Sequence, residues 1–198
     1  MGKFIPKDTF YKKAKQDGYR ARSAYKLKEI QDKFHIIKKG DKVLDLGCAP
    51  GSFLQVISKI VGQEGLVVGI DILLTTPLPY KNILTMVNDI RNINMSDMLD
   101  TLSVTRFDVI TCDIAPNLSG IREADDKNIE ELYEASKRIV AEGLKPGGYY
   151  ILKSFFSEAF SAKQKGLKNL FTHVSVFKPT SSRNISSEIY FVCKEKIR

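Results

Sequence analysis

The 198-residue chain has no tryptophan, two histidines and three cysteines. Cys48, Cys112 and Cys193 are odd in number and far apart, so they do not form the framework of a small disulfide-rich protein. His35 and His173 are isolated, and no two cysteines have the spacing of a zinc site. The sequence therefore predicts reduced thiols and no bound metal.

The chain also lacks a long apolar run. Its most apolar stretch, residues 66–74, is interrupted by Gly69 and Asp71 and is too short to cross a bilayer. No basic segment followed by an apolar one opens the chain, as a secretory signal would. We expect a protein without membrane contact that is intracellular rather than secreted, in the cytoplasm or mitochondrion, with the nucleolus as a further option.

Charge is unevenly distributed along the sequence. Lys and Arg total 31 against 23 Asp and Glu, a net charge of +8. Residues 1–42 hold 13 basic and 5 acidic side chains, residues 43–144 hold 8 and 15, and residues 145–198 hold 10 and 3. Basic ends around an acidic middle indicate a polyanionic partner at the ends and a different ligand in the middle.

Apolar periodicity predicts an α/β fold. Residues 8–34 have a helical pattern with a basic face. Beyond residue 42, short apolar runs alternate with helical patterns, which is typical of a parallel sheet covered on both faces. The expected strands are 43–46, 66–70, 83–87, 107–112, 149–152, 173–177 and 188–192, and the expected helices are 52–61, 95–102, 129–143 and 157–171.

The length fits one domain over residues 1–198. We expect residues 1–42 to form a basic helical arm and residues 43–198 a doubly wound, Rossmann-like core. Its sheet should be mostly parallel and seven-stranded, with helices on both faces. The last two strands have no helix between them, which predicts an antiparallel C-terminal hairpin at one edge.

Four aspartates fall at or near the ends of expected strands, namely Asp45, Asp71, Asp89 and Asp113. Any one of them is readily explained as a turn or helix-cap residue. Four on successive strands favour a site, because ligands of open α/β sheets bind beyond the carboxyl ends of the strands.

Residues 47–53 form a glycine-containing turn between the first strand and a helix. Ala49 stands where the dinucleotide fingerprint requires its second glycine, and no Gly-Lys-Ser/Thr follows as in a P-loop. The turn therefore suits a nucleoside without phosphates, with Asp71 accepting the ribose hydroxyls and Asp89 the adenine amine. S-adenosylmethionine, which also carries an ammonium and a sulfonium, is the predicted cofactor. A tight turn with helix caps is the structural alternative.

With these features the sequence resembles the FtsJ-type ribosomal RNA 2′-O-methyltransferases. The resemblance runs from about Asp8 to Cys193 and rests on five blocks in the right order. They are residues 20–27 (RARSAYKL), 45–51 (DLGCAPG), 113–120 (DIAPNLSG), 146–153 (PGGYYILK) and 181–188 (SSRNISSE). Phe53 and Ser52 depart from the family, which usually has Trp and often Gly at these positions.

The resemblance implies an S-adenosylmethionine-dependent enzyme with a Lys-Asp-Lys-Glu catalytic tetrad. The tetrad falls on Lys26, Asp113, Lys153 and Glu188. The expected cofactor-binding residues are Gly47, Ala49, Pro50, Gly51, Phe53, Asp71, Asp89 and Asp113.

Lys153 and Glu188 also stand out physically, because each borders an apolar strand where an unpaired charge is costly. Desolvation and a neighbouring Lys26 would favour the neutral amine of Lys153, which could then take the proton of a ribose hydroxyl. Glu188 is expected to orient Lys153 or the hydroxyl. A buried Lys153–Glu188 ion pair without chemistry is the alternative.

Two other methyl-transfer chemistries fit less well. Amino-group methylases favour an Asp/Asn-Pro-Pro-aromatic sequence, whereas here Pro116 follows three residues after Asp113. Methylation at pyrimidine carbon 5 needs a thiolate, and Cys112 is interpreted as a core thiol because it ends an apolar strand beside Asp113.

The basic ends predict an RNA surface that leads to the tetrad. We expect the substrate to be a uridine in large-subunit rRNA or the pre-ribosomal subunit, and the protein to be a monomer. A tRNA 2′-O-methyltransferase and a non-catalytic RNA-binding ribosome-assembly factor are the alternatives. The side chains proposed for this surface are Phe10, Tyr11, Lys12, Lys13, Lys15, Tyr19, Arg20 and Arg22 at one end and Lys163, Lys165, Lys168, Lys178 and Arg183 at the other.

Overall fold

The computed structural model describes residues 9–116, 119–156, 159–182 and 186–198. Arg183, one of the expected RNA-facing residues, lies outside the described residues. In chain order the elements are α1 (Thr9–Gln16), α2 (Ser23–Phe34), β1 (Lys42–Leu46), α3 (Ser52–Val61), β2 (Leu66–Asp71), β3 (Ile83–Val87), η1 (Ile90–Asn92), α4 (Met95–Leu102), β4 (Phe107–Cys112), α5 (Arg122–Gly143), β5 (Leu144–Phe155), α6 (Phe160–Lys168), β6 (Phe171–Phe177) and β7 (Glu188–Lys196).

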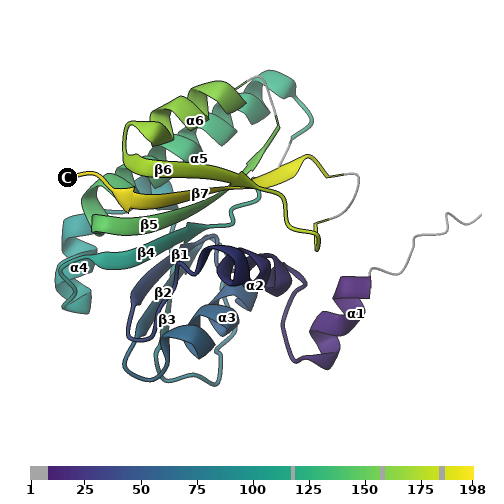
Figure 1. Cartoon of the computed structure of the whole chain (residues 1–198), viewed down its shortest axis with the longest axis vertical. Coiled ribbons are helices and arrows are strands. Elements are labelled where there is room, and N and C mark those ends of the chain that lie inside the picture. Colours follow the sequence, from purple (N-terminus) through teal and green to yellow (C-terminus); the bar gives the residue numbers. More distant parts are fainter. Residues whose placement is uncertain (1–8, 117–118, 157–158, 183–185) are drawn as a thin grey trace, which may run out of the picture.

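The seven strands form one sheet in the order β3-β2-β1-β4-β5-β7-β6 (Figure 1). The neighbours from β3 to β5 pair in parallel, whereas β7 pairs antiparallel with both β5 and β6. The predicted fold class and its C-terminal hairpin are confirmed. Within the hairpin, β7 is the inner strand and β6 forms the edge. Because β7 reverses direction, its first residue lies beside the ends of the parallel strands.

Helices cover both faces of the sheet (Figure 1). α2 and α3 pack on one face, where Ala24, Leu27 and Ile30 of α2 are completely buried. α4, α5 and α6 cover the other face, whose core includes Ile139 of α5 and Leu167 of α6. Successive buried side chains of the strands point to opposite faces of the sheet and pack in both cores, as expected for a doubly wound fold.

The N-terminal segment differs from the single helix expected over residues 8–34. It forms α1 and α2 with a break between them, where Gly18 adopts a left-handed φ of 74°. Part of this segment therefore belongs to the core, because α2 lies against α3. The division into residues 1–42 and 43–198 stays a prediction. Among the described residues, no helix has the length and apolar character to span a membrane.

Candidate active site

The carboxyl edge of the sheet brings several predicted residues together. Asp71 is the last residue of β2, and Asp113 directly follows β4. Lys153 lies near the end of β5 and pairs in register with Tyr190 of β7. Glu188 is the first residue of β7. The ends of β2, β4 and β5 and the start of β7 thus place three carboxylates and a lysine at one edge.

Lys26 and Glu188 form a tight buried ion pair. Nζ of Lys26 lies 2.6 Å from Oε1 of Glu188 and donates a hydrogen bond of 2.8 Å to Oε2. The two side chains are only 7% and 9% exposed, so water screens the pair weakly. The Ser182 hydroxyl donates to Oε1 of Glu188 at 2.9 Å. Although burial favours the neutral acid, hydrogen bonding and charge from Lys26, together with Lys153 and Ser182, lower the pKa of Glu188.

Lys153 is held less closely. Its Nζ lies 3.4 Å from Oδ1 of Asp113 and 3.9 Å from Oε2 of Glu188, and it donates a hydrogen bond of 3.3 Å to the backbone carbonyl of Asp113. Its side chain is 8% exposed. The tetrad is therefore a compact pair, Lys26 and Glu188, next to a lysine with longer contacts. The catalytic roles of the four residues stay predictions.

Tyr190 also belongs to this cluster, although its apolar neighbours in the sequence predict only a core strand residue. Its hydroxyl donates to Oδ1 of Asp113 at 2.6 Å, and the residue is completely buried. Burial, with the nearby charge of Asp113, raises the pKa of Tyr190 well above its ordinary value. Its spacing from Glu188 could have indicated this position, because residues two positions apart on a strand point to the same face.

The turn between β1 and α3 has the predicted glycine-dependent shape. Gly47 and Gly51 adopt positive φ angles of 78° and 104°. A Cβ atom on Gly47 would lie 2.6 Å from Cγ1 of Ile114, so only glycine lets the loop after β1 pack against the loop after β4. The turn leaves the N-terminus of α3 at the carboxyl edge of the sheet.

Asp71 joins the loop after β1 to the loop after β2. Its Oδ2 accepts a hydrogen bond of 2.9 Å from the backbone N–H of Ala49, and its Oδ1 accepts one of 2.9 Å from that of Leu73. A carboxylate offers about four acceptor positions, so Asp71 keeps capacity for two ribose hydroxyls. The donor chemistry of an adenosine therefore fits this side of the site.

Asp89 and Asp45 have different surroundings. The Asp89 carboxylate contacts the Arg91 guanidinium at 2.6 Å, and hydrogen bonds from Arg91 lower the pKa of Asp89. Asp45 lies inside β1, completely buried, where the Thr111 hydroxyl donates to its Oδ1 at 2.6 Å. Burial raises the pKa of Asp45 well above its ordinary value, and its Oδ2 has no hydrogen-bond partner among the described residues. Asp45, the next-to-last residue of β1, thus lies near the strand end as predicted, but in the interior of the protein.

Phe53 is only 3% exposed and packs with Ala24 and Ile57 in the core beneath α2 and α3. A contact between Phe53 and the cofactor stays a prediction. Pro50, by contrast, is exposed in the loop between β1 and α3.

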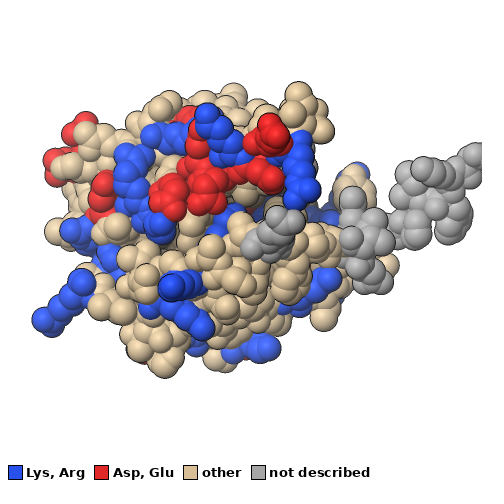
Figure 2. All heavy atoms as spheres, turned by 90° about the horizontal axis from the view of Figure 1, so that it is seen from above, with Lys and Arg blue, Asp and Glu red and all other residues tan. Residues whose placement is uncertain are grey.

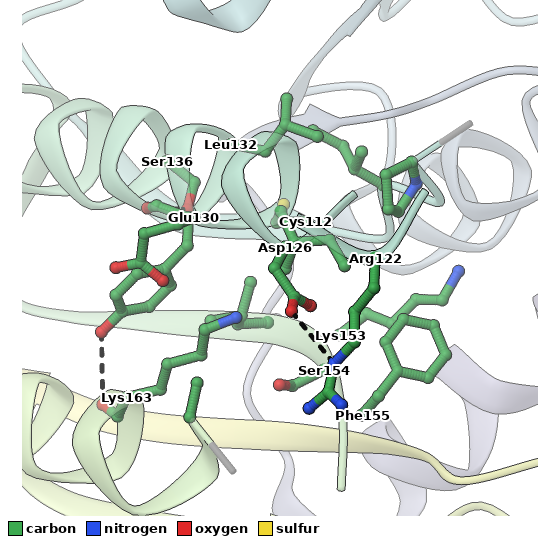
Figure 3. Close-up of a pocket in the computed structure, with 16 residues that line it drawn as sticks. Cys112, Arg122, Asp126, Glu130, Leu132, Ser136, Lys153, Ser154, Phe155 and Lys163 are labelled. Atoms are coloured by element: carbon green, nitrogen blue, oxygen red, sulfur yellow. Dashed lines mark hydrogen bonds and ion pairs between the residues drawn. The ribbon is translucent and has the colours of Figure 1, made fainter. Parts of the chain in front are cut away.

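A cavity of about 510 Å³ lies on the other face of the sheet, between α5, α6 and β5 (Figure 3). Lys153 lines it alongside Leu152 and Ser154, and none of the other predicted catalytic or cofactor residues does. Figure 3 shows the Lys163 side chain reaching into this cavity. Lys163 is 8% exposed, and burial lowers its pKa, so the expectation that it belongs to an exposed RNA surface is wrong.

Cys112 also lines the cavity. Burial raises the pKa of the Cys112 thiol to about 12, so at neutral pH it stays protonated and is a poor nucleophile. This agrees with its interpretation as a core thiol and disfavours methylation at pyrimidine carbon 5.

The lysines of α6 do not share one face with those of α1 and α2. Figure 2 looks onto the side of α5 and α6, where acidic side chains gather between lysines and arginines. Lys165 and Lys168 belong to α6 on this side, away from α2. The exposed acidic residues of α5 are Glu123, Asp126, Glu130, Glu131, Glu134 and Glu142. Their charge repels phosphates, so α6 does not extend the surface formed by α1 and α2.

Residues 19–196 match the family model described as FtsJ-like methyltransferase. The chain belongs to this family. It is 42% identical over 189 residues to the ribosomal RNA large subunit methyltransferase E of Methanothrix thermoacetophila, covering 96% of this chain and 72% of that protein. It is 38% identical over 190 residues to the protein of the same name from Bdellovibrio bacteriovorus, covering 96% of both.

A solved structure agrees with this membership. A crystal structure from Plasmodium falciparum, given as that of a candidate ribosomal RNA methyltransferase, is 30% identical and superposes with a TM-score of 0.77. The match covers 90% of this chain and 99% of that one. The match to this family confirms the resemblance found in the sequence, and it confirms S-adenosylmethionine as the methyl donor.

Proposed function

We propose that this protein transfers a methyl group from S-adenosylmethionine to the 2′-hydroxyl of a uridine in large-subunit rRNA. The observation that carries the proposal is the position of Lys153, whose amine lies between Asp113 and Glu188 at the edge where the cofactor loops also end. The names of the relatives, which are 38–42% identical over nearly the whole chain, support the same substrate.

The reaction needs alignment and a proton acceptor. The cofactor would supply a methyl group on a sulfonium, from which the neutral thioether leaves readily. Lys153 would take the proton of the 2′-hydroxyl as a general base, the hydroxyl oxygen would bond to the methyl carbon, and S-adenosylhomocysteine would leave as the sulfur–carbon bond breaks. No metal enters this proton transfer.

The tight Lys26–Glu188 pair leaves Lys153 with the longer contacts of the cluster. The charge of Glu188 is offset mainly by Lys26 at 2.6 Å, whereas Lys153 is 3.9 Å away. The hydroxyl of Tyr190 donates a hydrogen bond to Oδ1 of Asp113. Lys26 is therefore the main partner of Glu188, and Lys153 makes only longer contacts to Glu188 and Asp113.

The RNA-facing surface consists, in our proposal, of α1, α2 and the loop between β6 and β7. Glu29 of α2 accepts hydrogen bonds from the backbone N–H groups of Thr180 and Ser181 at 2.6 and 2.9 Å, which joins this loop to α2. Lys178 in the loop and Lys12 on α1 are exposed. Their cations can bind phosphates beside the tetrad.

The aromatic residues on this surface have two uses. Phe10 and Tyr19 pack against the buried Tyr25, with ring centroids 5.6 and 5.9 Å away, and hold α1 to α2. Tyr11 is 52% exposed and is available to stack on an unpaired base.

The alternatives predict different substrates. A tRNA methyltransferase would label tRNA, and an assembly factor would bind the cofactor or RNA without transferring the methyl group. We infer an intracellular location, because rRNA is modified where ribosomes are made, and a monomeric protein without a metal.

The test incubates the wild-type protein with radiolabelled S-adenosylmethionine and separated rRNA and tRNA from cells that lack this activity. We expect label in large-subunit rRNA, recovered as 2′-O-methyluridine after nuclease digestion. Label in tRNA alone, in another nucleoside, or in no RNA despite cofactor binding would overturn the proposal.

A further inference from the structure

Arg20 lies in the turn between α1 and α2, and Gln55 of α3 forms two hydrogen bonds with this turn. The backbone N–H of Arg20 donates to Oε1 of Gln55 at 2.9 Å, and Nε2 of Gln55 donates to the carbonyl of Gly18 at 2.9 Å. Gln55 is buried, so these contacts fix where the Arg20 side chain begins.

The guanidinium of Arg20 binds backbone carbonyls rather than facing solvent as an RNA-binding cation would. Its Nη1 donates to the carbonyl of Pro50 at 2.9 Å and to that of Thr76 at 2.5 Å. Its Nη2 donates to the carbonyl of Pro77 at 2.7 Å. One planar group thus connects the loop after β1 with the loop between β2 and β3, which corrects the expectation that Arg20 belongs to the RNA surface.

These are the two loops that Asp71 joins from the other side, through Ala49 and Leu73. They also meet closely at Gly51. A Cβ atom there would lie 3.1 Å from Leu78 and 3.3 Å from Nη1 of Arg20. The space behind the glycine turn is therefore filled by the arginine and the second loop.

We propose, on the basis of the cofactor site given above, that Arg20 is a positioning residue for S-adenosylmethionine. It holds the glycine turn and the loop after Asp71 at a fixed separation, and with them the groups that face the adenosine. A lysine cannot replace it, because three carbonyls on two loops require the separate donors of a guanidinium fork.

The test measures binding of S-adenosylhomocysteine by calorimetry, which requires no turnover. We expect Arg20→Ala and Arg20→Lys to weaken binding by about tenfold, ~1.4 kcal/mol. Lys165→Ala, which removes one exposed positive charge from α6, should leave this affinity unchanged. In methyl-transfer assays the Arg20 variants should raise KM for S-adenosylmethionine and keep kcat at saturation.

Two results would overturn the inference. The first is an Arg20→Lys variant that binds S-adenosylhomocysteine as tightly as the wild type. This variant also tests the inference if Arg20→Ala does not fold. The other is a loss of RNA affinity in Arg20→Ala, with the slope of log K against log salt reduced by about one and cofactor binding intact, because that marks a phosphate contact. Failure of the wild-type protein to bind S-adenosylhomocysteine would instead refute the cofactor site.

Discussion

The carboxyl edge of the sheet has two halves that are built differently. In the cofactor half, at the ends of β1 and β2, Asp71 contacts Ala49 and Leu73, which are 22 and 2 residues away in the sequence. In the reaction half, at the ends of β4, β5 and β7, Lys26 contacts Glu188 across 162 residues. The cofactor half is joined by Asp71 and by Arg20 across at most 57 residues, whereas the reaction half depends on a pair that forms only when the two ends of the chain meet.

This difference predicts that substitutions in the two halves have separable effects. Changes in the cofactor half should alter cofactor affinity. Changes in the reaction half should alter the rate of methyl transfer, or the stability of the fold that brings α2 to β7.

The largest effect is expected for Lys153→Ala. Loss of a general base lowers the rate by about 10²- to 10⁴-fold, whereas the loops that bind the cofactor are untouched. Single-turnover assays at saturating S-adenosylmethionine measure the rate, and calorimetry with S-adenosylhomocysteine measures affinity. A variant that loses affinity to the same degree as rate would break the distinction between the halves.

Glu188→Gln should lower the free energy of unfolding by about 3 kcal/mol at pH 7, because it leaves the buried Lys26 without its partner. Urea denaturation measures the change. Glu29→Gln is the matched control, since Glu29 also accepts hydrogen bonds between α2 and the β6–β7 loop but is more exposed. An equal loss in both variants would contradict the special role of the buried pair.

The same variant predicts a pH dependence. Because the pKa of Glu188 is lowered in the folded state, its carboxylate stabilises the fold above the ordinary value of 4.5, and this contribution is lost as the pH falls through the lower folded value. The stability difference between wild type and Glu188→Gln should therefore shrink below about pH 4.5. A gap that stays constant down to pH 3, about 1.5 units below that value, would contradict the assignment.

Asp71→Asn should weaken binding of S-adenosylhomocysteine by roughly 10- to 100-fold, the usual range for a hydrogen bond to a charged group. The rate should recover when S-adenosylmethionine saturates the enzyme. Asn keeps one acceptor oxygen, which can retain the bond from Ala49 that joins the loops, whereas the bond from Leu73 is lost. A lowered rate at saturation would place Asp71 functionally in the reaction half.

The smallest effects are expected on the RNA surface, which borders the reaction half. Lys12→Ala and Lys178→Ala should each reduce the slope of log K against log salt by about one. Lys165→Ala on α6 is the control, because that helix lies beside the acidic residues of α5. Filter binding with an rRNA fragment at several salt concentrations measures the slopes, and an equal reduction for Lys165→Ala would contradict the surface assignment.

The sequence predicted the locally determined parts of the molecule well. The helices over residues 52–61 and 95–102 have the predicted bounds, because each is a short amphipathic segment between clear turns. The glycine turn and Asp71 were likewise recognisable, since their geometry depends on residues close in the chain.

The remaining features depend on contacts that no local pattern encodes. β5 is longer than expected, running from Leu144 to Phe155, because Leu144 already pairs with Phe107 of β4 and residues 150–155 pair with β7. Tyr190 looked like a core residue until the fold placed its hydroxyl on Asp113. In the sequence, Arg20 and Lys163 are recognisable only as positive charges. Charge alone does not indicate whether a cation faces RNA, a backbone carbonyl or a cavity.

The central claim is that Lys153 performs the chemistry while a separate half of the edge holds the cofactor. The most direct measurement compares single-turnover transfer of labelled methyl groups to unmodified large subunits by Lys153→Ala and Asp71→Asn, over a range of S-adenosylmethionine concentrations. We predict that Lys153→Ala stays slow at every concentration, whereas Asp71→Asn reaches the wild-type rate at saturation. Wild-type transfer by Lys153→Ala would contradict the account.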